Sequence, residues 1–157
     1  MNAMTNADHF NRLRYSHWIK DHVRFSDLDP LGHVNNNAIG TYFENARAAL
    51  FAILTPSWPY GNNIFVLARS AIDFRHELHY PAQLMVGSCV LKIGTTSMVL
   101  ANALFNEDTG NGIAFCESVS VLIDKDSRKP VPLPPELRAK LEQFRDGLNG
   151  QVKAKAV

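Results

Sequence analysis

The sequence predicts an α+β fold, in which one long helix is wrapped by a curved antiparallel sheet of about five strands and a short helix follows near the C-terminus. Residues 37–54 carry apolar side chains at the period of an amphipathic helix. Five other stretches are predicted strands, because their residues alternate between apolar and polar or are continuously apolar. Turn-forming residues separate most of them. A long apolar helix and a curved sheet can bury one another, so we expect one hydrophobic core.

The first strand is predicted over residues 19–27, where apolar and polar side chains alternate. The long helix follows, and residues 35–37 are asparagines, a residue type that caps the free amides of a first helical turn. Its end is predicted at Thr55, because the residue before a proline is biased away from helical conformation. The side chains expected to face the core are Ile39, Tyr42, Phe43, Ala46, Leu50 and Ile53.

Four further strands are predicted over residues 64–79, 84–93, 98–106 and 113–123. The connections between them are short and rich in glycine, proline or polar turn formers. We therefore expect a meander, in which each strand pairs with the next.

The chain is expected to close with a short helix, because Pro135 can occupy a first helical turn. No repeat or linker suggests a second domain. The predicted boundaries are a flexible arm over residues 1–14, a single domain over 15–147 and a tail over 148–157.

The composition is that of an ordinary globular protein, with 46% hydrophobic and 20% charged residues. A chain of 157 residues can bury a core without disulfides or metals. Its 16 basic and 15 acidic residues leave a net charge of +1, which lacks the basic surface that nucleic acids require. No nucleic-acid partner is therefore expected.

The two cysteines, Cys89 and Cys116, lie in apolar runs without partners at metal spacing, as is typical of reduced intracellular thiols. The N-terminal residues are too polar for a secretory signal, and no run approaches the roughly 20 apolar residues that cross a bilayer. We expect a cytoplasmic protein with no membrane partner. No metal site is predicted, because His76 and His79 lie three apart in a predicted strand and would point to opposite faces.

Residues 27–37, Asp-Leu-Asp-Pro-Leu-Gly-His-Val-Asn-Asn-Asn, concentrate polar side chains between the first strand and the long helix. Pro30 biases Asp29 toward an extended backbone and Gly32 permits a sharp turn, so Asp29 should be held close to the first helical turn. Amides at a helix N-terminus can stabilise a developing oxyanion. An ionised aspartate beside them could attack a polarised carbonyl or activate water, which predicts hydrolysis of an activated acyl group.

The same residues also suit a loop without a catalytic role. Aspartate and asparagine commonly cap helices, and glycine and proline commonly form turns. Spacing alone leaves both interpretations open.

Residues 24–47 resemble the opening motif of the acyl-CoA thioesterases of the 4-hydroxybenzoyl-CoA thioesterase group. In that motif an Asp-x-Asp pair precedes Gly-His-Val-Asn-Asn and a helix bearing Phe-Glu-x-Ala-Arg, as it does here. The likeness extends over about residues 17–141. It implies a hotdog fold, thioester hydrolysis without a cofactor, and an active site between subunits. A long sheet with apolar content on both faces usually needs covering, so we expect a homodimer or homotetramer.

In this group the second aspartate of the pair is the catalytic carboxylate, which corresponds to Asp29, and we assign Asp27 to structure. The segment also resembles plant acyl-acyl carrier protein thioesterases, which use an Asp, an Asn and a His. Asp29 and His33 match them, but Leu31 stands at the Asn position. This departure argues against an asparagine-assisted mechanism. The substrate expected is acyl-CoA, ahead of an acyl carrier protein thioester. His33 either orients the carboxylate or water, or hydrogen-bonds the loop.

Substrate contacts are expected at the start of the helix, with backbone amides near residues 34–37 as the oxyanion site. Several members of the group carry basic residues at the turn after the third strand, where this chain has Gly-Thr-Thr-Ser. The CoA phosphates therefore need other partners, and Ser97 either reaches a ligand from the partner subunit or bonds its own turn. The residues expected to bind substrate are Gly32, Val34, Asn35, Asn36, Arg75, Ser97, Arg128 and Lys129.

Two other functions stay open from the sequence. A hotdog hydratase or dehydratase is one, although its Asn-Pro-x-His or Pro-Gly-His arrangement is absent. A non-catalytic acyl-binding module is the other. The apolar stripe of the helix does not decide between them, because such a stripe is core more often than substrate pocket.

Overall fold

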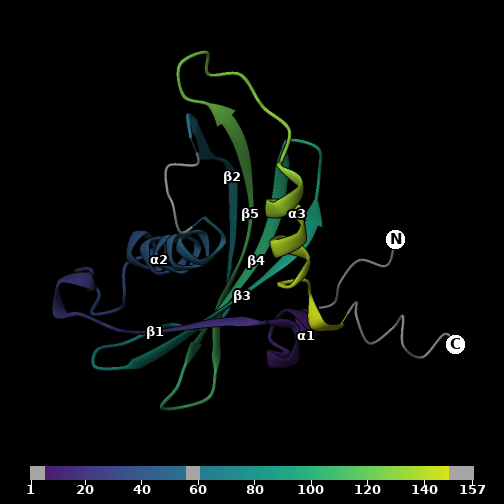
Figure 1. Cartoon of the computed structure of the whole chain (residues 1–157). Coiled ribbons are helices and arrows are strands. Elements are labelled where there is room, and N and C mark those ends of the chain that lie inside the picture. The colour runs from purple at the N-terminus through teal and green to yellow at the C-terminus, as the bar shows by residue number, and fades with distance from the viewer. Residues whose placement is uncertain (1–5, 56–60, 149–157) are drawn as a thin grey trace, which may run out of the picture.

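A five-stranded antiparallel sheet curves around a long helix in the computed structural model of the chain (Figure 1), which describes residues 6–55 and 61–148. The strands are β1 His17–His22, β2 Asn63–Phe74, β3 Gln83–Ile93, β4 Ser97–Asn106 and β5 Gly112–Asp124. The helices are α1 Asn6–His9, α2 Asn36–Leu54 and α3 Pro135–Glu142, with short 3-10 turns at Arg12–Arg14 and Phe25–Asp27. This arrangement confirms the predicted hotdog fold.

The strands follow the order β1-β3-β4-β5-β2 across the sheet. Strands β3, β4 and β5 form the predicted meander. The prediction is wrong for β2, which pairs with β5 and not with β3, while β1 takes the place beside β3. Residues 75–82 therefore carry the chain from β2 at one edge of the sheet to β3, the strand next to the opposite edge.

Strand β2 ends at Phe74, so the prediction of a strand reaching residue 79 is wrong. The amides of Arg75 and His76 both donate to the carbonyl of Ile113, at 2.8 and 3.2 Å, instead of continuing the ladder one residue at a time. The alternation of apolar and polar residues continues beyond Phe74, although the ladder of hydrogen bonds to β5 ends there. The chain leaves the sheet at this point.

The segment that leaves the sheet packs against the start of α2. The amide of Val34 donates a hydrogen bond of 2.8 Å to the carbonyl of Leu78, and both side chains are buried. This bond joins the loop before α2 to the connection between β2 and β3. It sets the two segments side by side at one end of the molecule.

Strand β1 is also shorter than predicted and ends at His22 rather than at Asp27. A 3-10 turn replaces its last residues, because the amide of Asp27 donates to the carbonyl of Arg24 at 2.9 Å. In return, the Asp27 carboxylate accepts from the amide of Arg24 at 2.8 Å. The turn leaves Phe25 76% exposed.

Helix α2 begins at Asn36, and Asn35 caps it by accepting a hydrogen bond of 2.8 Å from the amide of Asn37. The predicted buried stripe is confirmed except at one position, since Ile53 is 50% exposed and Leu54 is buried instead. The confirmed positions are Ile39, Tyr42, Phe43, Ala46 and Leu50. They join core clusters that include side chains of β3, β4 and β5.

The N-terminal segment covers the opposite face of the sheet, where α1 lies in Figure 1. Phe10, Tyr15 and Trp18 pack over this face, and Phe105 of β4 contacts two of them. Gly87 of β3 permits the approach, because a Cβ there would lie 2.7 Å from Cγ of Tyr15. The N-terminal segment is therefore packed against the sheet from Phe10 onward.

Both cysteines are fully buried in the core. Burial raises the pKa of the Cys89 thiol to about 12, and it also raises the pKa of Cys116. Both thiols are therefore protonated and poorly reactive at neutral pH.

Within the described ranges, no helix has the length and apolar content to cross a membrane. The cytoplasmic location and the domain boundaries stay predictions.

A buried ion pair joins the two ends of the described chain. Nη2 of Arg14 lies 2.7 Å from Oδ2 of Asp146, and the two side chains are 0% and 3% exposed. Removing one member of such a pair leaves a buried charge without its counter-charge. The pair therefore holds the N-terminal segment against the residues that follow α3.

We expect Asp146→Ala to lower the free energy of unfolding by about 3–5 kcal/mol, measured by urea denaturation. The matched control is Glu142→Ala, which removes an ion pair with Arg145 in which the arginine and glutamate side chains are 40% and 56% exposed. That variant should lose no more than about 1 kcal/mol. Equal losses in the two variants would contradict a special role for the buried pair.

Candidate active site

The loop between the 3-10 turn and α2 is closed by its own backbone. Leu28 and Val34 form an antiparallel bridge, and the amide of Asp29 donates to the carbonyl of His33 at 2.9 Å. The amide of Gly32 returns a hydrogen bond of 3.0 Å to the carbonyl of Asp29, and Gly32 adopts a φ of 80° that favours glycine. The result is a tight turn with Asp29 at its base.

The Asp29 carboxylate is held by amides of the same loop. Its Oδ1 accepts hydrogen bonds from the amides of Leu31 at 2.8 Å and His33 at 3.3 Å. No described residue donates a hydrogen bond to Oδ2. One oxygen therefore fixes the carboxylate within the turn, while the other has no donor among the described residues.

Asp27 has a different environment, which agrees with its assignment to structure. Its Oδ2 accepts a hydrogen bond of 2.5 Å from the hydroxyl of Tyr42, which is 1% exposed. Burial and this hydrogen bond raise the pKa of Tyr42, so the phenol remains a donor at neutral pH. The pair anchors the 3-10 turn to α2.

Most amides at the start of α2 already have partners within the protein. The amide of Val34 donates to Leu78, that of Asn35 donates to the carbonyl of Asp27 at 2.8 Å, and that of Asn37 donates to the Asn35 side chain. Three of the four amides in the expected oxyanion site, residues 34–37, are therefore already used within the protein. Within the described chain, the amide of Asn36 makes no hydrogen bond to another residue, and Asn36 is exposed.

A groove of about 360 Å³ runs beside this loop. One wall consists of Asp29, His33 and Asn36 with the buried side chains behind them, and residues 74–78 form the other. Arg75 is thus brought to the expected site by the crossing segment. The groove brings the predicted carboxylate, histidine and helix start together.

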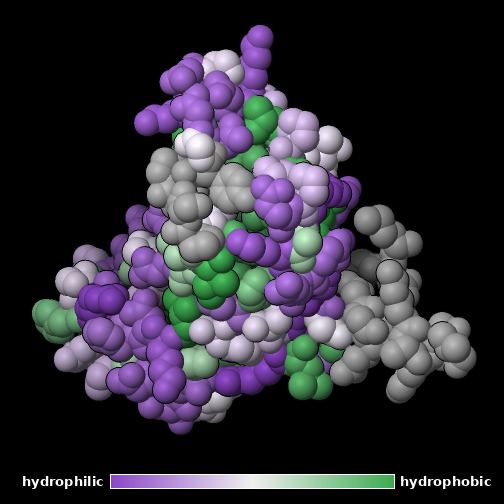
Figure 2. Space-filling model, in the orientation of Figure 1, coloured by the Kyte–Doolittle hydropathy of each residue, from purple (hydrophilic) through white to green (hydrophobic). Residues whose placement is uncertain are grey.

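The remaining predicted substrate contacts lie at the other end of the sheet. Arg128 and Lys129 follow Asp124, which pairs with the first residue of β2, whereas the groove adjoins its last residue. The twelve residues of β2 separate these ends by roughly 35 Å. Ser97 pairs with Val121 and lies toward the same far end. Hydrophilic side chains gather there, at the top of the face in Figure 2.

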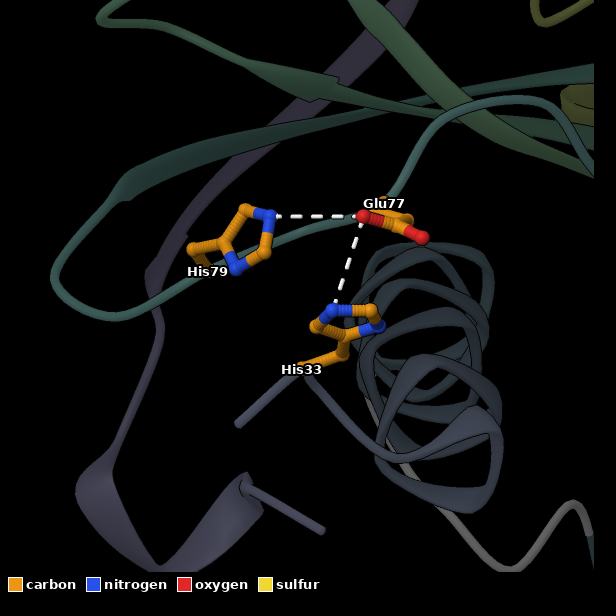
Figure 3. A group of neighbouring side chains, drawn as sticks. All are labelled: His33, Glu77 and His79. Carbon is orange, nitrogen blue, oxygen red and sulfur yellow. Dashed lines mark ion pairs between the residues drawn. The ribbon is translucent and has the colours of Figure 1, made fainter. Parts of the chain in front are cut away.

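Two groups near His33 were not expected from the sequence. Nε2 of His33 lies 3.5 Å from Oε2 of Glu77, and Nε2 of His79 lies 3.6 Å from the same oxygen (Figure 3). The two imidazole rings meet edge to face with centroids 4.9 Å apart. Glu77 and His79 lie after β2, more than 40 residues beyond His33 in the sequence. No short motif therefore links them to His33.

A curved sheet around a long helix, with an Asp-x-Asp and Gly-His loop at the helix start, defines the class of hotdog thioesterases. The chain belongs to the thioesterase-like superfamily, whose family model matches residues 23–141. This match confirms the resemblance seen in the opening motif.

Three relatives illustrate the similarity. The chain is 31% identical over 124 residues to the long-chain acyl-CoA thioesterase FadM of Escherichia coli strain K12, covering 78% of this chain and 94% of that protein. The structure of the PA5185 protein from Pseudomonas aeruginosa strain PAO1 matches with a TM-score of 0.76 at 26% identity, covering 86% and 95%. A thioesterase from Thermus thermophilus, solved with coenzyme A and Zn, matches with a TM-score of 0.72 at 30% identity, covering 81% and 98%.

We expect Tyr42→Phe to lower the free energy of unfolding at pH 7 by about 1.5–3 kcal/mol, because the Asp27 carboxylate loses the hydrogen bond that the Tyr42 hydroxyl donates to it. The raised pKa of Tyr42 means that this contribution is complete below the ordinary phenol pKa of 10.0 and declines as the pH rises through the folded value. Denaturation by urea measures the loss.

The control is Tyr80→Phe, since Tyr80 is 49% exposed. It should change the unfolding free energy by less than about 0.5 kcal/mol. A Tyr42→Phe protein as stable as the wild type would contradict the anchoring role of the Tyr42–Asp27 bond.

Proposed function

We propose that the protein hydrolyses acyl-CoA thioesters to a free carboxylic acid and CoA, with Asp29 as the reacting carboxylate. Membership of the thioesterase-like superfamily supports the reaction class. The names of the relatives support the substrate class, since FadM acts on long-chain acyl-CoA and the Thermus protein was solved with coenzyme A. The observation that carries the proposal is the Asp29 carboxylate, which the loop amides orient beside the groove.

In this mechanism Oδ2 of Asp29 faces the thioester carbonyl. It either attacks the carbonyl carbon, giving an anhydride that water then hydrolyses, or removes a proton from an attacking water. Both routes expel the CoA thiolate and develop negative charge on the carbonyl oxygen. The amide of Asn36, in the first turn of α2, is the donor proposed for that charge.

His33 is proposed to assist proton transfer. Its side chain lies on the groove wall beside Asp29, and its amide also supports the carboxylate. An imidazole in this position can orient the water or protonate the leaving thiolate. In this proposal the backbone amide of His33 orients the Asp29 carboxylate, whereas its imidazole ring transfers protons.

The CoA phosphates are proposed to be bound by basic residues from two places. Arg75 lines the groove of its own subunit. The other candidates are Arg128, Lys129 and Ser97. Within one chain they lie too far from Asp29 to contact the phosphates of a CoA whose thioester is bound there. We propose that they come from a neighbouring subunit of a homodimer or homotetramer.

We expect Asp29→Asn to lower kcat by at least about a hundredfold across a panel of acyl-CoAs. Asparagine retains the oxygen that accepts from the amides of Leu31 and His33, so the loop should keep its conformation while the charge is lost. Release of CoA can be followed with a thiol-reactive dye, because both protein thiols are buried.

The matched control is Asp108→Asn. Asp108 also accepts a hydrogen bond from a backbone amide, that of Gln83 at 3.0 Å, but it does not line the groove. This variant should retain wild-type turnover. An Asp29→Asn enzyme as active as the wild type would rule out Asp29 as the reacting group.

The two alternative functions have their own readouts. Formation of 3-hydroxyacyl-CoA from enoyl-CoA without CoA release would favour a hydratase. Tight binding of acyl-CoA without turnover would favour a binding module.

The proposed phosphate contacts can be tested with the double variant Arg128→Gln and Lys129→Gln. We expect KM for acyl-CoA to rise about tenfold with little change in kcat, as for the loss of a charge-assisted hydrogen bond. Thioesters of pantetheine lack the nucleotide, so their KM should not change. Lys20→Gln, which removes an exposed charge from β1, is the control variant. An equal rise in KM for both kinds of thioester would argue against phosphate recognition.

A further inference from the structure

Three side chains that converge at the rim of the groove have the composition of a metal site. His33 comes from the loop before α2, whereas Glu77 and His79 come from the segment that crosses from β2 to β3 (Figure 3). One ligand atom from each lies within 4.8 Å of the other two. The side chains of His33, His79 and Glu77 are 35%, 58% and 66% exposed, so an ion can reach them from solvent.

The two distances to Glu77 are longer than direct hydrogen bonds and close to the spacing of ligands on one ion. Oε2 of Glu77 lies 3.5 Å from Nε2 of His33 and 3.6 Å from Nε2 of His79. Hydrogen bonds between nitrogen and oxygen are shorter, roughly 2.7–3.2 Å. Two ligands of one tetrahedral zinc ion lie about 3.3–3.4 Å apart, which follows from metal–ligand bonds of about 2.0–2.1 Å. Small side-chain adjustments would bring all three atoms onto one ion.

The ligand types narrow the ion to a class. Two imidazole nitrogens and one carboxylate oxygen suit zinc and similar first-row transition ions, whereas calcium and magnesium prefer oxygen ligands throughout. Three protein ligands leave a fourth position for water or for a ligand atom. The exposed carboxylate also offsets part of the charge of the ion.

We propose that His33, Glu77 and His79 bind one divalent ion of the zinc class at the rim of the groove. The sequence pattern predicts no metal site because it places residue 79 in a strand, and that prediction of the strand is wrong. The segment has in fact left the sheet, which frees His79 to turn toward His33. The backbone bond between Val34 and Leu78 holds the two ligand-bearing segments together without the ion, so the site needs little reorganisation.

The test is calorimetric titration of chelator-treated protein, without a histidine tag, with Zn²⁺, together with the visible absorption of bound Co²⁺. We expect one ion per chain and a tetrahedral Co²⁺ spectrum. His79→Ala and Glu77→Gln should each weaken binding by at least about tenfold. The matched control is His76→Ala, an exposed histidine of the same segment that is outside the cluster.

A second measurement is independent of affinity. Because the ion would join two segments, saturating Zn²⁺ should raise the melting temperature of the wild type and of His76→Ala, but not that of His79→Ala. Circular dichroism of each variant checks that it is folded, as expected for changes at exposed side chains. Absence of saturable binding to the wild type, or equal weakening by His76→Ala and His79→Ala, would overturn the proposal.

One consequence rests on the proposed function. An ion bound at Nε2 of His33 removes that nitrogen from proton transfer, so Zn²⁺ should slow hydrolysis reversibly in the wild type and much less in His79→Ala. Binding is measured without substrate, so the two proposals can fail separately. Full activity of the zinc-saturated enzyme would overturn the proton-transfer role of His33 and leave the metal site in place.

Discussion

The hydrogen bond from the Val34 amide to the Leu78 carbonyl is the constraint on which the groove end of the molecule depends. It ties the loop before α2 to the segment that crosses the sheet from β2 to β3. Asp29 lies on one side of this join and Glu77 on the other, so both the groove and the histidine cluster require it. Because both partners are backbone groups, the join does not depend on the identity of neighbouring side chains.

The parts of the site that the sequence predicts are those formed by local interactions. Asn35 caps α2 through an amide two residues away, and Gly32 supplies the positive φ of a turn closed within the same loop. The position of Asp29 follows from these neighbours, which is why the sequence alone predicts that it lies close to the start of the helix. The buried stripe of α2 follows in the same way from the helical period, apart from its last turn, where Leu54 replaces Ile53.

The parts that the sequence does not predict depend on pairing between distant strands. The alternation of apolar and polar residues in β2 continues beyond Phe74. The strand stops because the Ile113 carbonyl accepts hydrogen bonds from two successive amides, those of Arg75 and His76. The same pairing with β5 separates Arg128 from the groove of its own chain, a separation that no local pattern indicates. Arg14 and Asp146 are a further case, since nothing local in either segment indicates a buried partner.

The side chain of Leu31 is 79% exposed, whereas its amide makes the shorter of the two hydrogen bonds that hold Asp29. The residue at this position supports the carboxylate only through its main chain. The side chain at this position can therefore be exchanged without disturbing the hydrogen bonds that hold the Asp29 carboxylate. Replacing Leu31 by the asparagine of the plant acyl-acyl carrier protein thioesterases that the segment resembles would change only an exposed side chain and leave the main-chain support of Asp29 as it is.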